Sequence, residues 1–367
     1  MNTAVEGNIP TYTILEADGQ HPDSAVEDII FNESPTHSYK VRFLRTSLAP
    51  SGTADRKPWT EIPKEIRDEV DALMILKLYL TAEDIELFPK LKVVVRMGVG
   101  YEKLDRVTLD KKGVTVCNVP DGLPLSMNAD YGTEEIADHA IALTLAMRRG
   151  ILLHHDLQRD TTPAPYCPID HPLVARSRGS TFGILGLGRI GTATALRAKA
   201  FGHNVLFYDP YLPNGVDKSI GCERTKDIRE LFRRSSILSV HAPATRETRN
   251  LVDYSLLSLL PRGAVFVNTA RGEIVDLDGI ERALKEGIIS GAALDVLPVE
   301  PIPEPAHPLI QAYRRKEEWL TGRMVLTCHT AFFSPSSVEE IRSKSAQTMR
   351  EVLIDKLQSN VITPDME

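Results

Sequence analysis

Residues 181–209 read TFGILGLGRIGTATALRAKAFGHNVLFYD, and this stretch decides the fold. Gly186, Gly188 and Gly191 form a GxGxxG pattern that follows an apolar run and opens a helix-like segment. Glycines recur by chance, but between a strand and a helix this pattern is typical of a turn that binds the pyrophosphate of a dinucleotide. Gly186 would permit the tight turn, Gly188 the approach of the phosphates, and Gly191 close packing of helix on strand.

The ends of the two elements around this turn favour NAD. Arg189 and Ile190 lie in the first turn of the helix, where free N–H groups and the helix dipole attract phosphate. Asp209 ends the next apolar run, 18 residues past the last glycine, where its carboxylate can accept both ribose hydroxyls of the adenosine. It would repel a 2′-phosphate, and the next residues, Pro210 and Tyr211, bring no cation to offset this. The alternative is an unrelated glycine-rich turn beside a surface aspartate.

Strand-like and helix-like segments alternate on both sides of this stretch. Strands are expected at 181–186, 204–208, 236–241, 264–268, 291–296 and 324–328. Helical patterns separate several of them, at 189–201, 226–234 and 276–286. Alternation over this length predicts an α/β fold with a doubly wound parallel sheet.

The first part of the chain has a similar texture. Apolar runs at 71–76, 92–96 and 114–119 suit strands buried on both faces of a second parallel sheet. A helix is expected between two of them, at 80–88, and a long one at 134–149. The segment 155–178 contains four prolines and is expected to be an irregular crossing between the two parts of the chain. The segment 301–323 is expected to be a surface loop with a short helix. A final helix, 337–357, follows the last strand and is free to return to the first domain.

Length and composition limit the possible classes of protein. At roughly 150 residues per domain, 367 residues predict about 2.4 domains, so we expect two. The net charge is −7 and no dense cluster of Lys or Arg is visible, which disfavours direct binding to nucleic acid. The apolar run 140–147 is too short to span a membrane, and the start lacks the pattern of a secretory signal. We therefore expect a soluble intracellular protein, cytoplasmic or nuclear.

The four cysteines indicate neither a disulfide framework nor a metal site. Cys117, Cys167, Cys222 and Cys328 lie far apart, with no C-x-x-C pair and no histidine at ligand spacing. We expect reduced, mostly buried thiols and no bound metal.

Three ionisable residues follow successive expected strands. Arg271 lies in VNTARGEIVD, Glu300 follows GAALDVLPV, and His329 ends MVLTCH. Open α/β sheets bind ligands at the carboxyl ends of their strands. A cation can hold a substrate carboxylate and polarise its oxo group, while His329 with a carboxylate partner, Glu300, can move a proton. Each residue alone also has a structural interpretation. His329 could be a structural histidine at a strand end, Arg271 a surface ion-pair partner, and Glu300 a solvated loop residue.

Two further residues at strand ends receive other roles. Asp295 closes the strand before Glu300 and is expected to face the nicotinamide carboxamide. His241, in SVHAP, competes with His329, but Ala242 and Pro243 beside it offer no acid partner. We therefore expect His241 to line the cofactor site.

These segments resemble the D-isomer-specific 2-hydroxyacid dehydrogenases. VNTARGEIVD, GAALDV with the following Glu300, and His329 after a strand carry the likeness, and VRMGVGYEKLD near Arg96 extends it over nearly the whole chain. The resemblance implies a flavodoxin-like substrate-binding domain, 1–125 with 332–367, into which a Rossmann NAD-binding domain, 126–331, is inserted. It also implies Arg271, Glu300 and His329 as the catalytic triad.

The resemblance implies further contacts with both ligands. Backbone N–H groups of the loop Met97, Gly98, Val99 and Gly100 would bind the carboxylate of the substrate, with Arg271 and Phe332. Cofactor contacts are expected from the glycine turn and Asp209, and from His241, Ala242, Pro243, Thr248, Thr269, Ala270, Asp295 and His329.

Within this family the chain is most similar to the carboxyl-terminal-binding proteins, NAD(H)-sensing transcriptional corepressors. RAKAFGHNVLFYDPYL (197–212), CNVP (117–120) and HTAFFS (329–334) are the specific parts, and they imply a homodimer built through the cofactor domains. Phe332 stands where those corepressors have tryptophan, and Cys328 where the family usually has proline. The segments 121–131 and 301–323 are expanded.

Two functions follow as hypotheses. The first is an NAD-dependent dehydrogenase that interconverts a small 2-oxo acid and its D-2-hydroxy acid. The second is a corepressor-like scaffold that binds PxDLS-type peptides of transcription regulators.

Overall fold

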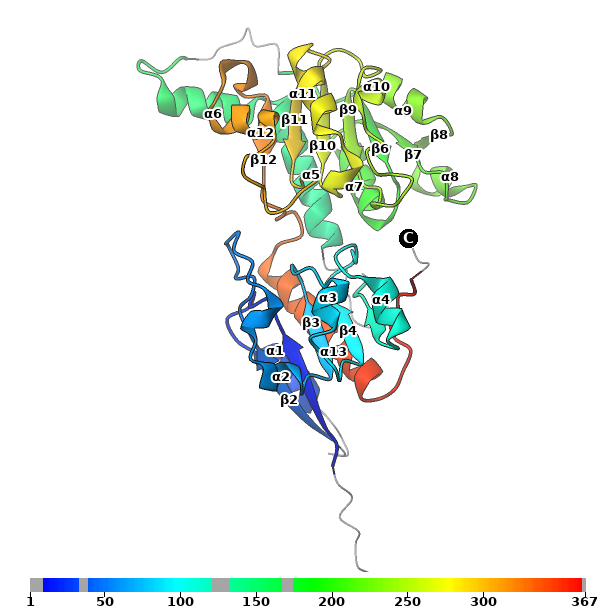
Figure 1. Ribbon diagram of the computed structural model, residues 1–367. Coiled ribbons are helices and arrows are strands. Elements are labelled where there is room, and N and C mark those ends of the chain that lie inside the picture. Colours follow the sequence, from blue (N-terminus) through cyan, green and yellow to red (C-terminus); the bar gives the residue numbers. More distant parts are fainter. Residues whose placement is uncertain (1–8, 33–38, 121–131, 167–173, 365–367) are drawn as a thin grey trace, which may run out of the picture. The chain divides into compact units, whose positions relative to one another are not determined.

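The chain folds into two compact units. The structure, a computed structural model, describes residues 9–32, 39–120, 132–166 and 174–364. Unit 1 is Met1–Tyr131 with Ser334–Glu367, and unit 2 is Gly132–Phe333 (Figure 1). The expected junction at 125/126 lies outside the described residues. The other junction lies two residues later than the expected 331/332, because Ser334 already caps the final helix.

Unit 1 holds a five-stranded parallel sheet in the order β2-β1-β3-β4-β5, the order of flavodoxin-like sheets. Its strands are β1 (Thr11–Glu16), β2 (Lys40–Arg45), β3 (Ala72–Ile75), β4 (Val93–Arg96) and β5 (Thr115–Cys117). Its helices are α1 (Ala25–Asn32), the 3₁₀ turn η1 (Trp59–Glu61), α2 (Lys64–Arg67), α3 (Ala82–Ile85), α4 (Arg106–Lys111) and α13 (Pro335–Leu353). The four residues of β3 are all buried, as expected for an apolar run with both faces covered.

The last helix completes the first unit. Ser334 accepts a hydrogen bond from the Ser337 N–H, and Pro335 occupies the first turn, where no N–H is needed. From this start, α13 packs against α1 and β4. The helix expected at 337–357 therefore exists, begins two residues earlier and ends at Leu353.

Unit 2 holds a seven-stranded parallel sheet in the order β12-β11-β10-β9-β6-β7-β8. Its strands are β6 (Thr181–Leu185), β7 (Asn204–Tyr208), β8 (Glu223–Thr225), β9 (Ile237–Val240), β10 (Ala264–Asn268), β11 (Ile289–Leu294) and β12 (Met324–Leu326). Its helices are α5 (Thr133–Arg148), α6 (Ile151–Asp160), α7 (Arg189–Ala200), α8 (Val216–Ile220), α9 (Ile228–Arg234), α10 (Tyr254–Leu257), α11 (Leu277–Lys285) and α12 (Pro308–Arg314), with 3₁₀ turns η3 (Gly272–Ile274) and η4 (Glu318–Leu320). The doubly wound α/β fold is thus confirmed in both units.

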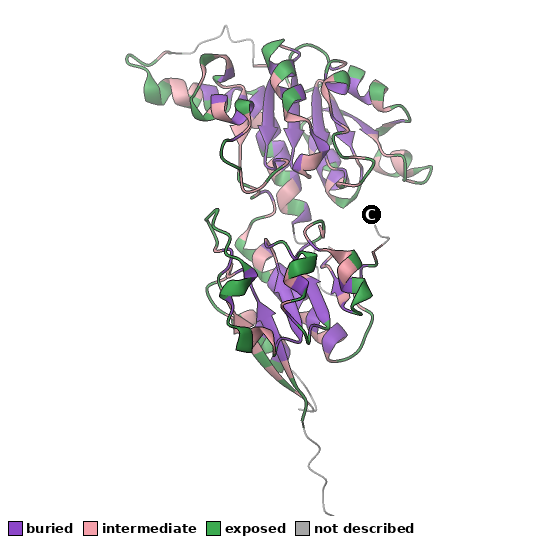
Figure 2. Cartoon of the chain, in the orientation of Figure 1, coloured by how far each residue is buried: buried purple, intermediate pink, exposed green. Residues whose placement is uncertain are grey.

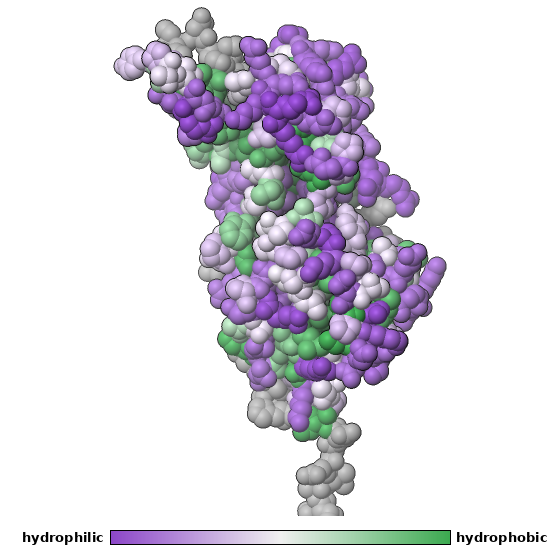
Figure 3. Space-filling view, turned by 60° about the vertical axis from the view of Figure 1, so that its left-hand side comes forward, coloured by the Kyte–Doolittle hydropathy of each residue, from purple (hydrophilic) through white to green (hydrophobic). Residues whose placement is uncertain are grey.

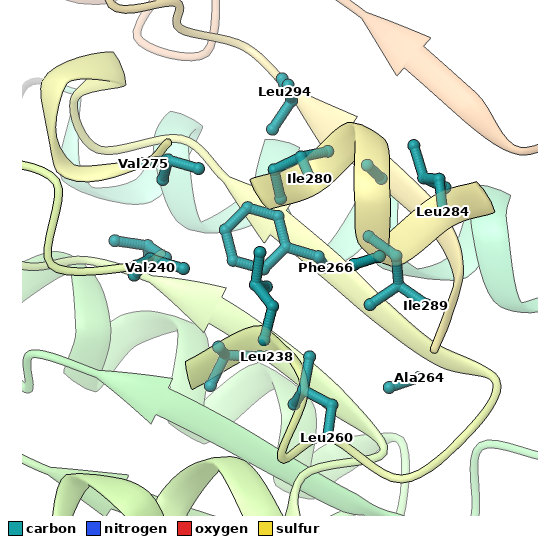
Figure 4. Packing of buried hydrophobic residues seen from close by; sticks show 14 of the residues in the cluster. Leu238, Val240, Leu260, Ala264, Phe266, Val275, Ile280, Leu284, Ile289 and Leu294 are labelled. Atoms are coloured by element: carbon teal, nitrogen blue, oxygen red, sulfur yellow. The ribbon is translucent and has the colours of Figure 1, made fainter. Parts of the chain in front are cut away.

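Helices cover both faces of this sheet, and the strands are buried between them (Figure 2). Successive side chains of β10 point to opposite faces: Phe266 belongs to one apolar cluster, and Val265 and Val267 to the other. Figure 4 shows Phe266 among Leu238 and Val240 of β9 and residues of α11. Covering helices on both faces hold the strands rigidly, so the loops at their carboxyl ends have fixed starting points.

Two expected loops contain helices. The segment 155–178 was expected to be irregular, but α6 continues to Asp160, because the first proline of that segment is Pro163. Within 301–323, α12 is more than a surface helix: Leu309 and Ile310 are buried in the core against α11.

The surface is mainly hydrophilic in the face shown in Figure 3. No helix of the described residues is long and apolar enough to cross a bilayer. Cys117 and Cys222 are buried, and burial raises the pKa of the Cys117 thiol to about 12. Cys328 is exposed, contrary to the expectation of buried thiols, because it follows the last strand; Cys167 lies outside the described residues.

Candidate active site

The glycine turn of unit 2 joins β6 to α7 and has the form that a pyrophosphate requires. Gly186 has a φ of 89°, and a Cβ there would lie 2.7 Å from the Ala242 nitrogen. At Gly191 a Cβ would overlap the carbonyl oxygen of Gly186, whereas at Gly188 it would meet no atom within 4 Å. Two glycines thus permit close packing, and the third leaves open space beside the first turn of α7, where Arg189 and Ile190 lie. The residues fit a bound dinucleotide.

Asp209 lies directly after β7, beside this turn. Its carboxylate accepts hydrogen bonds from the N–H of Leu187, at 2.9 Å, and from the N–H of Tyr211, at 3.0 Å. Each bond uses a different carboxylate oxygen, and each oxygen retains a lone pair for a further donor. The aspartate is therefore fixed against the turn and can still accept a ribose hydroxyl.

The loop after β9 borders the same turn. The N–H of His241 donates to the Leu185 carbonyl oxygen at 2.8 Å, and its Nε2 lies 2.8 Å from the Ser239 hydroxyl. Burial lowers the pKa of His241 to about 4, so the ring is neutral at physiological pH. Its Nδ1 is buried without a partner among the described residues, so His241 keeps one polar atom for a ligand. Pro243 and Thr248 follow in a turn closed by the Thr248 hydroxyl, which donates to the Pro243 carbonyl oxygen at 2.6 Å.

The strands that carry the expected triad are neighbours, and their ends are level. Asn268 of β10 pairs with Leu294 of β11, which pairs in turn with Leu326 of β12. Arg271 and His329 each lie three residues past these positions, and Asp295 lies one residue past. Sheet register therefore brings the three segments to one edge, as the sequence pattern predicts.

His329 and Glu300 lie in direct contact, as the prediction of an acid–base pair requires. The distance from His329 Nδ1 to Glu300 Oε2 is 2.6 Å, and the other oxygen of Glu300 accepts the Leu297 N–H at 2.8 Å. The side chain of His329 is 41% exposed, and its Nε2 has no partner among the described residues. The carboxylate thus orients the ring and leaves Nε2 accessible.

Arg271 follows β10 and precedes η3. Its guanidinium donates to the Ala270 carbonyl oxygen at 2.8 Å. The side-chain amide of Asn268 accepts a hydrogen bond from the Ala270 N–H and donates one to the Arg271 carbonyl oxygen. A Cβ at Gly272 would overlap the Leu297 carbonyl carbon, so this turn packs directly on the segment that leads to Glu300. The sequence alone gave no reason to single out Gly272. Thr269 is buried, and its hydroxyl has no partner among the described residues.

Asp295 holds the segment that carries His329. Its carboxylate accepts hydrogen bonds from the N–H groups of Thr330 and Ala331, both at 3.0 Å, and from the Thr327 hydroxyl. The side chain of His139, from α5, lies 3.2 Å from the same hydroxyl. Sequence reasoning missed His139 and this structural role of Asp295, since neither lies in a recognisable spacing. The expected contact of Asp295 with the nicotinamide carboxamide stays a prediction.

Phe332 lies beside His329. Its ring centroid is 6.4 Å from that of His329, and the two rings are nearly perpendicular. An aromatic edge-to-face pair of this kind limits the orientations of both rings.

In unit 1, the loop after β4 contains the four residues Met97, Gly98, Val99 and Gly100. The Met97 N–H donates to the Ile75 carbonyl oxygen at 2.8 Å and the Gly98 N–H to that of Arg96 at 2.9 Å. Both N–H groups thus have partners within unit 1, and the contact of this loop with a substrate stays a prediction. The N–H groups of Val99 and Gly100 donate no hydrogen bond within the described part of the chain, and the loop is fixed by Asn118, which donates to the Val99 carbonyl oxygen.

One group of possible metal ligands, Asp278, Glu281 and His307, has ligand atoms within 4.8 Å of one another. His307 Nδ1 accepts the Leu309 N–H and thereby caps α12, while Nε2 lies 3.0 Å from an Asp278 oxygen. In the neutral ring this arrangement places the proton on Nε2, the atom that faces the carboxylates. The helix cap and the contact with Asp278 thus occupy both ring nitrogens of His307.

Known proteins share this architecture. A model of the D-isomer-specific 2-hydroxyacid dehydrogenase, NAD-binding domain, matches residues 141–331. The glyoxylate reductase of Korarchaeum cryptofilum is 36% identical over 290 residues, which cover 78% of this chain and 79% of that protein. C-terminal-binding protein 1 of Caenorhabditis elegans is 33% identical over 311 residues, which cover 83% of this chain and 40% of that protein. The chain thus spans less than half the length of the latter relative.

A solved structure agrees with the fold of the whole chain. An acyclic imino acid reductase in complex with NADPH and D-Arg superposes with a TM-score of 0.75 at 25% identity, over 95% of this chain and 99% of that one. Together with the glycine turn, the family match assigns NAD as the cofactor. This chain belongs to the D-isomer-specific 2-hydroxyacid dehydrogenases.

Proposed function

We propose that the protein interconverts a small 2-oxo acid and its D-2-hydroxy acid with NAD. The observation that carries the proposal is the 2.6 Å contact of His329 Nδ1 with Glu300, which leaves Nε2 accessible on the same ring. Reduction of a 2-oxo acid needs a hydride at C2 and a proton on the oxo oxygen. The bound cofactor supplies the hydride, so the protein has to supply the proton and hold the acid.

His329 is the proton donor in this proposal. Glu300 accepts the hydrogen bond from Nδ1 and thereby fixes the plane of the ring. Nε2 can then donate its proton to the developing alkoxide, and in the reverse direction it accepts the proton of the hydroxyl. Histidine suits both directions because its ordinary pKa is near physiological pH.

Arg271 is the anchor for the substrate. A guanidinium can bind a carboxylate through two parallel hydrogen bonds and can also stabilise charge that develops on the oxo oxygen. One nitrogen of this guanidinium donates to the Ala270 carbonyl oxygen at 2.8 Å. Because this hydrogen bond already orients the guanidinium, it needs less reorientation to bind the substrate. The contacts of the loop 97–100 and of Phe332 with the substrate stay predictions.

Oxidation of NADH with a panel of 2-oxo acids tests the proposal. The panel includes glyoxylate, pyruvate and hydroxypyruvate, and the configuration of the product is read by chiral chromatography. We expect turnover to a D-2-hydroxy acid. His329→Ala should lower kcat by about 10²- to 10⁴-fold, the usual contribution of a general acid. NADH affinity should change much less than kcat, because the glycine turn and Asp209 remain.

The exposed His155 of α6 provides the matched control, and His155→Ala should keep wild-type kcat. No oxidation of NADH across the panel, or a His329→Ala variant as active as the wild type, would overturn the proposal.

A second function is favoured by the match to C-terminal-binding protein 1 over 83% of this chain. We propose that unit 1 can also hold short PxDLS-type peptides, as a corepressor scaffold in the cytoplasm or nucleus would.

Exposed apolar side chains on α6, Ile151 and Leu152, support a homodimer as the form in which either function is exercised. Pull-down with such a peptide separates the two functions: no binding at high micromolar concentration contradicts the scaffold and leaves the dehydrogenase proposal intact.

A further inference from the structure

A side-chain bridge joins two loops on opposite sides of the glycine turn. The Tyr211 hydroxyl, in the loop after β7, donates a hydrogen bond to the Glu247 carboxylate, in the loop after β9. In the sheet, β7 and β9 are the two neighbours of β6. The bridge therefore crosses the carboxyl end of β6, where the glycine turn begins.

Hydrogen bonds fix the two loops that carry Tyr211 and Glu247. The carboxylate of Asp209 fixes the Tyr211 N–H at 3.0 Å, and Arg224 donates to the carbonyl oxygens of Asp209 and Leu212 at 2.7 and 2.9 Å. On the other side, the Thr248 hydroxyl closes the turn that contains Glu247. Because the loops are ordered already, forming the bridge costs little conformational entropy beyond that of the two side chains.

Packing does not explain the position of Tyr211. Its side chain is 76% exposed, and Glu247 is exposed as well. The exposed ring presents an apolar face that a ligand lying between the two loops can contact. The hydrogen bond to Glu247 raises the pKa of the phenol, so it remains a protonated donor at neutral pH.

We propose that Tyr211 and Glu247 form a clasp that retains the adenosine half of bound NAD. Asp209, which accepts the ribose hydroxyls, is two residues from Tyr211, so the adenosine lies between the loops that the clasp connects. The clasp must open before the adenosine can leave. It acts on the rate of cofactor release and takes no part in hydride or proton transfer. The inference concerns the cofactor alone and does not depend on the proposed substrate class.

Stopped-flow measurement of NADH release from the full-length protein tests the clasp. Tyr211→Phe and Glu247→Gln each remove the charged hydrogen bond and keep most of the side-chain volume. Each should speed NADH dissociation about 3- to 10-fold, the effect of one exposed hydrogen bond to a charged group. The Kd of ADP-ribose, measured by calorimetry, should rise by a similar factor, because that molecule contains the adenosine and lacks the nicotinamide.

The double variant shows whether the two residues act as a pair. If they do, Tyr211→Phe with Glu247→Gln releases NADH no faster than about 1.5 times the faster single variant. The chain offers a matched control in Tyr254, whose hydroxyl donates to Glu286 at 2.5 Å between α10 and α11. Tyr254→Phe should leave the dissociation rate unchanged.

Three outcomes overturn the clasp. They are an unchanged dissociation rate in either single variant, effects that multiply in the double variant, and equal increases in association and dissociation that leave the Kd unchanged. Thermal unfolding of each variant accompanies the kinetics, so loss of folded protein is recognised.

Discussion

At the scale of single residues, His329 combines an unusual backbone with the proposed proton transfer. Its φ of 56° lies in the left-handed region, which few residues other than glycine adopt. A hydrogen bond at the edge of the sheet stabilises this conformation: the His329 N–H donates to the Asp295 carbonyl oxygen at 2.8 Å. Strained backbones persist where the surroundings fix them, and they are frequent at functional sites. Here the turn directs the ring toward Glu300.

Asp209 supplies the prediction that belongs to this scale. Asp209→Ala removes the carboxylate that repels a 2′-phosphate and that can accept the ribose hydroxyls. We expect the ratio of the Kd for NADPH to that for NADH to fall at least about tenfold. Loss of the repulsion strengthens NADPH binding, and loss of the acceptor for the ribose hydroxyls weakens NADH binding, so both effects lower the ratio. Fluorescence titration with each nucleotide measures it. Asp217→Ala in the exposed helix α8 is the control, and an Asp209→Ala protein with an unaltered preference would contradict the assignment.

At the scale of elements, the segment 327–331 is a turn held by one buried carboxylate. Asp295 is 2% exposed and satisfies two N–H groups and a hydroxyl of that turn. The α5 helix adds His139 from the other side of the Thr327 hydroxyl. The position of His329 thus depends on β11 and α5 as well as on its own strand.

Asp295→Asn tests this support. An amide offers one acceptor oxygen where the carboxylate has two, so at least one N–H of the turn loses its partner. We expect a loss of stability of about 1–3 kcal/mol and a kcat lowered about 10- to 100-fold, with NADH affinity unchanged. Stability is measured by urea unfolding.

Asp253→Ala is the control, because Asp253 caps α10 by accepting the Leu256 N–H, and loss of this cap should cost stability without lowering kcat. A selective loss of NADH affinity in Asp295→Asn would show instead that this carboxylate acts on the nicotinamide.

At the scale of the whole molecule, a buried ion pair joins the two ends of the chain in unit 1. Arg342 of α13 donates to the Glu27 carboxylate of α1 at 2.9 and 2.7 Å. The side chains are 9% and 1% exposed, and the hydrogen bonds with Glu27 raise the pKa of Arg342. The discontinuous unit is thereby closed by a contact between residues 315 positions apart.

We predict that Arg342→Met lowers the free energy of unfolding by about 3–5 kcal/mol, because Glu27 is left buried without its partner. Replacing both residues by Met should restore most of this stability, since two apolar side chains can fill the same space. Arg234→Met removes an exposed ion pair with Glu223 and should cost less than about 1 kcal/mol. Chemical denaturation compares the variants; a loss that persists in the double variant would refute the ion-pair explanation.

Local patterns alone determined much of this molecule. The glycine turn, Asp209 and the alternating apolar runs predicted a parallel sheet and a dinucleotide site, because strand, turn and helix signals lie within a few residues of one another. Arg271, Glu300 and His329 could be selected because each follows a strand, and parallel strands bring their carboxyl ends to one edge.

Only the tertiary structure decided which atoms meet. The Glu300–His329 contact, the support from Asp295 and His139, and the Tyr211–Glu247 bridge join residues 29 to 188 positions apart. Such distances depend on sheet register and on the packing of helices over both faces, which no local spacing encodes.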